Sequence, residues 1–272
     1  MRTAIAYEWR RITTVRSTYW FSGMAVLFSG AIAYFIALGF GQSDFSSDGI
    51  QNFLQASTLV ITAGGSILFV PVLSAPFCGV LGAMSFGHEY RYGTIKQTLT
   101  AIPDRVVLFF AKLLVLMGWL LGVMILVVLV NTAMGALFLD GFSLSHEAIR
   151  PVVNFMLYNL GFGIAGFALA ATLRNLAGAL VAVLVYPFVI EPIGYNILRV
   201  VQLGTLDRLA NLFPASAGRR SIYSPYQLFA DPSSGSDVVF HVWGLGASVV
   251  VFWCGLLVVT AVGFALFLKR DA

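Results

Sequence analysis

Apolar runs of 18 or more residues recur six times along this chain, and no other feature restricts the possible folds as strongly. A run of that length crosses the hydrocarbon layer of a membrane as an α-helix. The six runs are Tyr19–Gly41, Leu59–Phe86, Val106–Leu139, Pro151–Leu173, Leu176–Leu198 and Val238–Leu268. Only 10% of the residues are charged, against about 25% in a typical soluble domain. We therefore expect an all-α integral membrane protein with six transmembrane helices in one domain over residues 1–272.

The distribution of charge predicts the orientation of these spans. Six spans place both termini on one side of the membrane. The termini and the even-numbered connections carry eleven basic and four acidic residues, whereas the opposite side carries five basic and eight acidic residues. Because basic residues collect on the cytoplasmic side, we expect a cytoplasmic-membrane protein with both termini inside the cell. The basic net charge therefore needs no nucleic acid partner to explain it.

The first 18 residues precede the first apolar run and have a different pattern. Ile5, Trp9, Ile12 and Tyr19 follow one another at roughly helical spacing, with arginines between them. This pattern indicates an amphipathic helix on the inner membrane surface. The alternative is a cytoplasmic extension of the first span.

The second run contains residues that bend a helix or let a neighbouring helix approach closely. They are Gly64, Gly65, Pro71, Pro76, Gly79 and Gly82. They serve either close packing or a moving hinge, and packing is the favoured interpretation.

Two later connections differ strongly in length. Only Arg174 and Asn175 join the fourth and fifth runs, which predicts a tight helical hairpin. The segment over residues 199–237 is the longest one outside the spans and is expected to be extracellular. Within it we expect a short helix at Leu203–Phe213 and turns at Pro214–Gly218 and Asp231–Asp237.

The connection after the second run is the most polar part of the expected cytoplasmic side. Within it, Thr94–Ala101 can form two helical turns, with Ile95, Leu99 and Ile102 on one face. Pro103 then ends this helix. A short amphipathic helix at this position is suited to contact a partner.

Motifs for catalysis and for metal binding are missing from the sequence. It contains no G-x-x-x-x-G-K-[ST] motif for ATP phosphates and no H-E-x-x-H motif. Its three histidines, His88, His146 and His241, lie in separate parts of the chain. We therefore expect no catalytic residue, no metal site and no cofactor in this chain.

The same polar connection resembles the ABC-2-type permease family, the membrane subunits of ATP-binding-cassette exporters. The matching pattern is a Glu and a Gly-Thr pair after the second span, then Pro-x-Arg, then a Lys early in the third span. In this sequence the pattern is carried by Glu89, Gly93, Thr94, Pro103, Arg105 and Lys112. The resemblance implies a type V exporter-like fold of six spans with an interfacial N-terminal helix.

The resemblance also implies a role for residues 87–105 in coupling to an ATPase. Thr94–Ala101 would be a coupling helix in a cleft of a separate ATPase subunit. Glu89 and Arg91 would anchor it, while Arg105 and Lys112 would fix the start of the third span. The implied coupling residues are Glu89, Arg91, Gly93, Thr94, Ile95, Leu99, Pro103 and Arg105. The alternative is that these charges only solvate the loop and satisfy the positive-inside pattern.

The partners that the resemblance implies are a separate ATP-binding cassette ATPase, a second permease copy and membrane lipid. The partner ATPase would bind ATP and Mg, and the permease pair would be a homodimer or a paralogous heterodimer. Export of a drug, a peptide or a lipid-like molecule is favoured. Import is disfavoured because importers carry an E-A-A loop, whereas Tyr90 and Arg91 follow Glu89 here.

Three polar residues within the expected spans are candidates for a substrate path: Glu191, Asn131 and Asn159. An ionisable group at membrane depth is a functional hypothesis by default. Glu191 either meets a cationic substrate, pairs with Arg199 or is protonated, and the nearby Pro187 and Pro192 predict a local break in the helix. The asparagines either line a path or form hydrogen bonds between helices.

Two other hypotheses of function compete with that of an export permease. One is a membrane immunity or assembly factor that keeps the fold without transporting anything. The other is a secondary transporter, which is less favoured because the first three and last three spans show no repeat.

Overall fold

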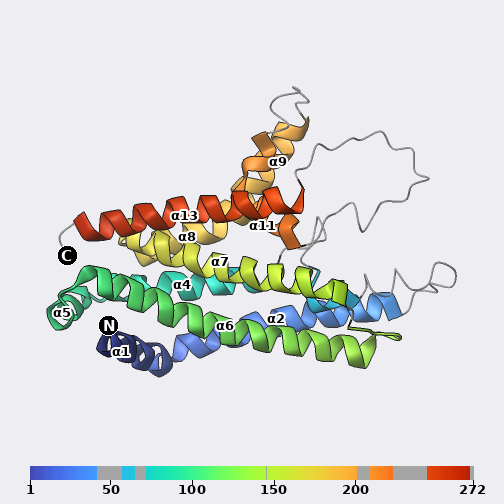
Figure 1. Cartoon of the computed structure of the whole chain (residues 1–272), viewed down its shortest axis with the longest axis horizontal. Coiled ribbons are helices and arrows are strands. Elements are labelled where there is room, and N and C mark those ends of the chain that lie inside the picture. Colours follow the sequence, from blue (N-terminus) through green and yellow to red (C-terminus); the bar gives the residue numbers. More distant parts are fainter. Residues whose placement is uncertain (42–56, 65–71, 145, 201–208, 223–243, 270–272) are drawn as a thin grey trace.

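The structure is a computed structural model that describes residues 1–41, 57–64, 72–144, 146–200, 209–222 and 244–269. Within these ranges every regular element is a helix, as Figure 1 shows. The longer helices are α2 (Arg16–Gly41), α4 (Ser74–Arg91), α6 (Arg105–Phe138), α7 (Ile149–Leu173) and α13 (Leu245–Lys269). The shorter ones are α1 (Arg2–Thr14), α5 (Ile95–Ala101), α8 (Leu176–Val185), α9 (Glu191–Val200) and α11 (Pro214–Ile222).

Among the residues that the structure describes, five helical segments are long and apolar enough to cross a membrane, so this is a multi-pass membrane protein. They are Arg16–Gly39, Arg105–Phe138, Ile149–Leu173, Leu176–Gly194 and Leu245–Lys269. All five overlap runs expected from the sequence. The expected sixth, Leu59–Phe86, is not one continuous helix.

The second run is interrupted where its glycines begin. Ala63 and Gly64 have positive φ angles of 48° and 67°, which a right-handed helix does not allow. Helix α4 begins only at Ser74, and residues 65–71 lie outside the described part of the chain. In the described part of the chain this run is therefore not one continuous helix, because the left-handed turn before residue 65 ends the first helical piece. Pro76 lies in the first turn of α4, where a missing N–H costs little.

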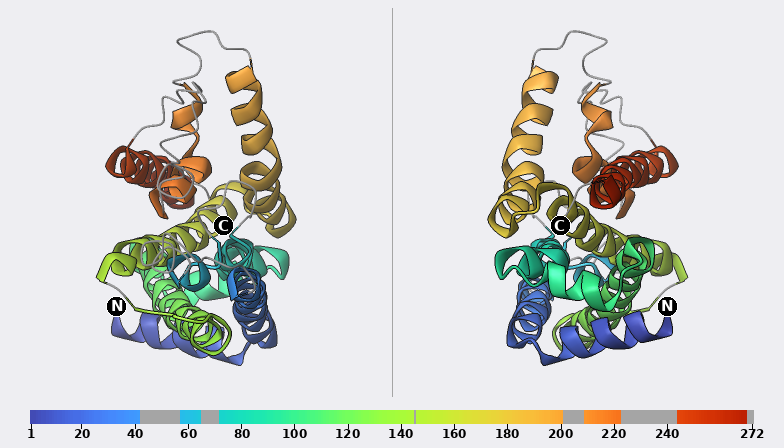
Figure 2. Two further views of the ribbon diagram at one scale, coloured as in Figure 1. Left: turned by 90° about the vertical axis from the view of Figure 1, so that its right-hand side faces the viewer. Right: turned by 90° about the vertical axis from the view of Figure 1, so that its left-hand side faces the viewer.

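The helices α2, α4, α6, α7 and α13 share one long direction (Figure 1). Helix α1 and helix α5 lie at the same end of this bundle, where α13 also ends. Figure 2 shows that α1 runs across the bundle rather than along it. Val15 makes this change of direction possible, because its extended backbone (φ −82°, ψ 114°) separates α1 from α2.

Helix α4 lies deepest in the bundle and makes backbone contact with α7. A Cβ atom added to Gly82 would meet the carbonyl oxygen of Gly163, and one added to Gly166 would meet that of Gly79. Two glycine pairs thus let the helices cross at a distance that any side chain would prevent. This geometry supports the packing interpretation of Gly79 and Gly82.

Aromatic rings fill the bundle between the glycine crossing and the end that carries α5. Phe86 of α4 and Phe109 of α6 both contact Phe167 of α7, with ring centroids 4.9 and 5.0 Å apart. Phe264 of α13 lies 5.0 Å from Phe109. Such pairs contribute about 0.5–1.5 kcal/mol each beyond their buried area. They join four helices at one level.

The hairpin between the fourth and fifth runs is as tight as the sequence predicts. Arg174 adopts the left-handed conformation (φ 51°) that ends α7. The Asn175 side chain then accepts hydrogen bonds from the amides of Ala177 and Gly178 at the start of α8. Further along, Tyr186–Ile190 forms a π-helical turn between α8 and α9, at the proline-rich site where a break was expected.

The expected outer segment contains a helix where we predicted turns. Pro214–Gly218 belongs to α11, with Pro214 at the first helical position, where its fixed φ is favourable. Gly218 faces Tyr158 of α7 and Phe252 of α13. Of the expected helix Leu203–Phe213, residues 201–208 lie outside the described ranges and Ala210–Leu212 is a short 3₁₀ turn. Asp231–Asp237 also lies outside them.

The glycine crossing predicts a large difference between two Gly→Ala substitutions. Gly82→Ala places a methyl group against the Gly163 carbonyl and should lower the free energy of unfolding by about 1–3 kcal/mol. Gly122→Ala in α6 has nothing within 4 Å of the new methyl group and serves as the control. It should stabilise α6 by about 0.5–1 kcal/mol. Unfolding by SDS in mixed micelles measures both, and equal effects would contradict the close crossing.

Candidate coupling site

The last turn of α4 and the short helix α5 lie at one end of the bundle. Helix α4 continues past Phe86 to Arg91, and Gly93 then turns the chain with φ 68°. A positive φ is easily reached only by glycine. Helix α5 follows at Ile95–Ala101, within the predicted segment Thr94–Ala101. The Asp104 carboxylate then accepts hydrogen bonds from two amides in the first turn of α6.

Helix α5 turns its apolar side toward the bundle and its polar side outward. Ile95 is only 5% exposed, and Leu99 and Ile102 pack against the same core. The predicted apolar face therefore contacts the permease itself rather than a partner. The outward face consists of Lys96, Gln97 and Thr100, all exposed.

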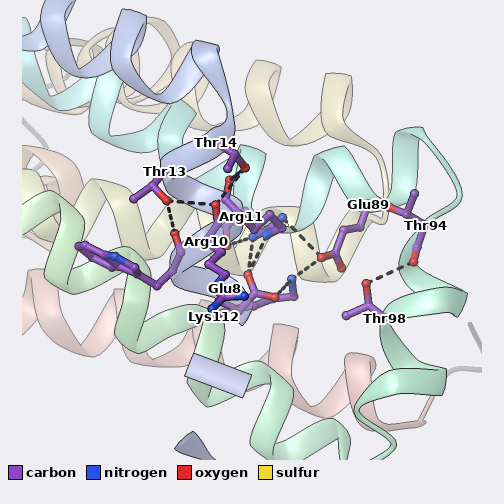
Figure 3. A network of polar contacts seen from close by, with 11 residues as sticks. Glu8, Arg10, Arg11, Thr13, Thr14, Glu89, Thr94, Thr98 and Lys112 are labelled. Carbon is purple, nitrogen blue, oxygen red and sulfur yellow. Dashed lines mark hydrogen bonds and ion pairs between the residues drawn. The ribbon is translucent and has the colours of Figure 1, made fainter. Parts of the chain in front are cut away.

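Four charged side chains meet beside the base of α5, and we call them the four-charge cluster: Glu8, Arg11, Glu89 and Lys112. The Lys112 ammonium lies 2.7 Å from the Glu8 carboxylate and 2.5 Å from that of Glu89. Arg11 lies 2.7 Å from Glu8 and 3.4 Å from Glu89. Figure 3 shows Arg11 reaching both carboxylates. The cluster ties together α1, α4 and α6 and carries two charges of each sign.

The positions of these residues in their helices explain their burial. Lys112 lies on the buried stripe of α6, one turn from both Leu108 and Leu116. Its side chain is fully buried, with its ammonium 5.4 Å from the Phe86 ring centroid. Glu8 and Ala4 are the buried residues of α1. A buried ammonium needs paired carboxylates because transfer of a bare charge from water costs several kcal/mol.

The pairing decides which face of α1 meets the bundle. The sequence suggested that Ile5, Trp9 and Ile12 form the important stripe, but the side against α6 carries Glu8 and Ala4. Trp9 is 48% exposed. Helix α1 is thus held by charges and by an edge-to-face contact of the half-exposed Trp9 with Trp119 of α6, whose ring centroids are 6.1 Å apart. Sequence reasoning missed both Glu8 and Arg11 as site residues. The available signal was that Glu8 is the only acidic residue before Asp44 and lies one turn from Arg11.

A cavity of about 560 Å³ opens beside the cluster, and we call it the α1–α4 cavity. Its lining includes Arg11, Arg16, His88, Glu89 and Thr94. Burial, with the charges of Arg11 and Arg91, lowers the pKa of His88 below its ordinary value. His88 therefore adds little positive charge near pH 7, which leaves the four-charge cluster balanced.

The other implied coupling residues have different environments. The Arg105 guanidinium donates to the carbonyl oxygens of Phe267 and Leu268, both at 3.3 Å, and so ties the start of α6 to the end of α13. Arg91 is exposed, with its guanidinium carbon 5.6 Å from the Tyr92 ring centroid. Pro103 lies in the short link between α5 and α6.

Comparison with known protein families matches residues 9–198 to the family described as "ABC-2 family transporter protein". This match covers more than half of the 272-residue chain. The chain belongs to the ABC-2 transporter family. It is therefore a permease of an ABC transporter, the membrane component that works with an ATP-binding cassette subunit. A search of curated proteins gave no match.

Glu191 of this ABC-2 permease caps a helix. Its side chain has no exposed surface, and one carboxylate oxygen accepts a hydrogen bond from the Ala215 amide at 3.0 Å. A carboxylate at the first turn of α11 also complements the helix dipole. This contact brings together α9 and α11, which are separated by 13 residues in the chain. The side chain of Arg199, its suggested partner, is not described.

The two asparagines are buried and bonded between helices. The Asn131 side-chain amide donates to the Ile61 carbonyl at 2.8 Å and to the Ser29 hydroxyl at 3.0 Å. The Asn159 side-chain oxygen accepts from the Ser74 hydroxyl at 2.7 Å. Neither asparagine has exposed surface. Both asparagines thus form the hydrogen bonds between helical segments that the sequence predicted as one alternative.

Removal of the central charge should strongly destabilise the permease. Lys112→Met leaves two buried carboxylates without their ammonium partner and should lower the free energy of unfolding by about 3–5 kcal/mol. Lys269→Met, at the exposed end of α13, is the matched control and should change little. SDS unfolding measures both.

A double-mutant cycle then separates pairing from packing. If the cluster is coupled, Glu89→Gln combined with Lys112→Met costs less than the sum of the single substitutions. Additive effects would show that Lys112 and Glu89 act independently.

Proposed function

We propose that this ABC-2 permease exports a drug, a peptide or a lipid-like molecule across the cytoplasmic membrane, driven by ATP hydrolysis in a separate subunit. In this proposal α5 is the coupling helix, and the end of the bundle that carries α1 and α5 faces the cytoplasm. The observation that carries it is the four-charge cluster beside α5, which joins three helices at that end.

The contacts provide a path for displacement from α5 into the membrane. A cassette subunit would press on the outward face of Lys96, Gln97 and Thr100. Because Gly93 is a single tight turn, α5 cannot move far without moving α4. From α4 the motion would reach α6 through the contact between Glu89 and Lys112. A short rigid connection of this kind transmits displacement better than a flexible loop does.

The same path would reach α1 at the membrane surface. Glu8 shares Lys112 with Glu89, so α1 would follow any movement of α4 relative to α6. Its exposed Trp9 would then slide at headgroup depth, where indole rings are favourable.

The proposed assembly contains two permease chains and two cassette subunits that bind ATP and Mg. The two permease chains would be identical or paralogous and would surround the substrate path. The many aromatic residues, including 23 Phe and 10 Tyr, favour an amphipathic or apolar cargo.

Purification of the tagged chain from its native membrane in a mild detergent tests the assembly. Mass spectrometry should find a stoichiometric soluble subunit with a G-x-x-x-x-G-K-[ST] motif. If no such subunit is found in several detergents and with nucleotide added, the exporter proposal is contradicted. A non-transporting membrane factor would then be the better explanation.

Reversal of one charge on the outward face of α5 should weaken this assembly. Lys96→Glu leaves the bundle contacts of α5 intact because Lys96 is exposed. We expect about tenfold weaker binding of the cassette subunit, equivalent to about 1.4 kcal/mol. Arg2→Glu makes the same change of charge on α1 and is the control. Co-purification at graded salt measures both, and equal losses would exclude α5 as the specific contact.

A further inference from the structure

A second cavity of about 560 Å³ lies at the same end of the bundle, between the end of α4 and the start of α8. We call it the α4–α8 cavity. It is lined by Tyr90, Arg91, Arg174, Asn175, Leu176, Ala177 and Leu180. None of these residues belongs to the four-charge cluster or to the outward face of α5.

The charges around this cavity are all positive. Arg91 and Arg174 line it, and no acidic residue is among the lining residues. Glu89, the nearest acid in sequence, is paired with Lys112 and lines the α1–α4 cavity instead. The first turn of the ten-residue helix α8 also faces the cavity, and a helix N-terminus carries partial positive charge. The cavity therefore favours an anion.

Arg174 holds its position at a conformational cost. It ends α7 with φ 51°, a left-handed conformation that normally falls to glycine or asparagine at this helix position. A non-glycine residue in that region costs about 1 kcal/mol. This backbone conformation places the guanidinium carbon 5.9 Å from the Tyr90 ring centroid, at the wall of the cavity. Glycine would make the same turn without strain but would supply no charge.

The rest of the wall is apolar and continues into the membrane. Leu176 and Leu180 line the cavity one turn apart on α8. One turn beyond Leu180, the half-buried Leu184 continues this side of a helix long and apolar enough to span the bilayer. A ligand with a charged head and an apolar tail matches this arrangement, because the head would contact the arginines while the tail followed α8.

We propose that the α4–α8 cavity binds an anionic phospholipid, with its phosphate between Arg91 and Arg174 and one acyl chain along α8. Guanidinium groups pair with phosphate oxygens through two parallel hydrogen bonds. Basic pockets between helices at the membrane surface are a recurrent way to hold lipid headgroups. The inference does not depend on transport or on a cassette subunit.

The test uses the purified full chain in a non-ionic detergent, titrated with phosphatidylglycerol or with phosphatidylcholine. Native mass spectrometry counts the bound lipid. Wild-type protein should retain phosphatidylglycerol in preference to phosphatidylcholine. Arg174→Gly should weaken phosphatidylglycerol binding by about tenfold, because a charge-assisted pair is lost. Its lipid-free unfolding temperature should stay close to that of the wild type, because the backbone strain that glycine removes offsets the lost contact with the Tyr90 ring. Arg91→Gln, at an exposed position, should also weaken binding.

Arg10→Gln is the control, since it removes an exposed positive charge at the same end of the bundle but outside the cavity. Retention by this variant at wild-type level supports the cavity. Equal losses in Arg10→Gln and Arg174→Gly would overturn the proposal in favour of diffuse surface attraction. Displacement of the lipid by excess inorganic phosphate would also overturn it, because the site would then bind free phosphate. Equal retention of the two lipids would overturn the anionic preference.

Discussion

The need to neutralise one buried ammonium group governs the end of this bundle. Lys112 lies on the buried stripe of α6 with apolar residues one turn away on either side, so its charge has no access to water. Glu8 and Glu89 satisfy it from two different helices. Since desolvated charges are stable only when paired in good geometry, this requirement fixes α1 and α4 against α6. The position of α5 follows, because only a tight turn separates it from α4.

Helix α4 connects two kinds of packing that make different demands. Near its middle, glycines bring the backbone of α4 against the backbone of α7, so no flexible side chain lies between the two helices to absorb a displacement. Near its end, Glu89 makes a polar contact with α6, and such contacts can exchange partners. A helix that is fixed at its centre and held by charge at its end can pivot about the fixed point. This combination suits an element that carries α5 at its tip.

The apolar runs predicted most of the spanning helices, and Pro103 marked the end of α5. The remaining features depend on contacts between distant residues, which local patterns do not contain. Glu8 and Lys112 are 104 residues apart, and neither position reveals its partner. Glu191 likewise caps a helix that begins 23 residues later in the chain. Because this partner is distant in sequence, the local pattern predicted a turn at Pro214. The broken second span depends on backbone angles that a hydropathy pattern does not report.

The order of the charged residues along the chain has a consequence for biogenesis. Synthesis proceeds from the N-terminus, so both carboxylates of the four-charge cluster leave the ribosome before Lys112 does. Helix α6 thus delivers its ammonium to an acceptor site whose components are already present. Until that moment Glu8 of helix α1 has only Arg11, in the same helix, as a partner. In the interfacial position proposed for α1, its half-exposed Trp9 would hold the helix at headgroup depth until Lys112 arrives.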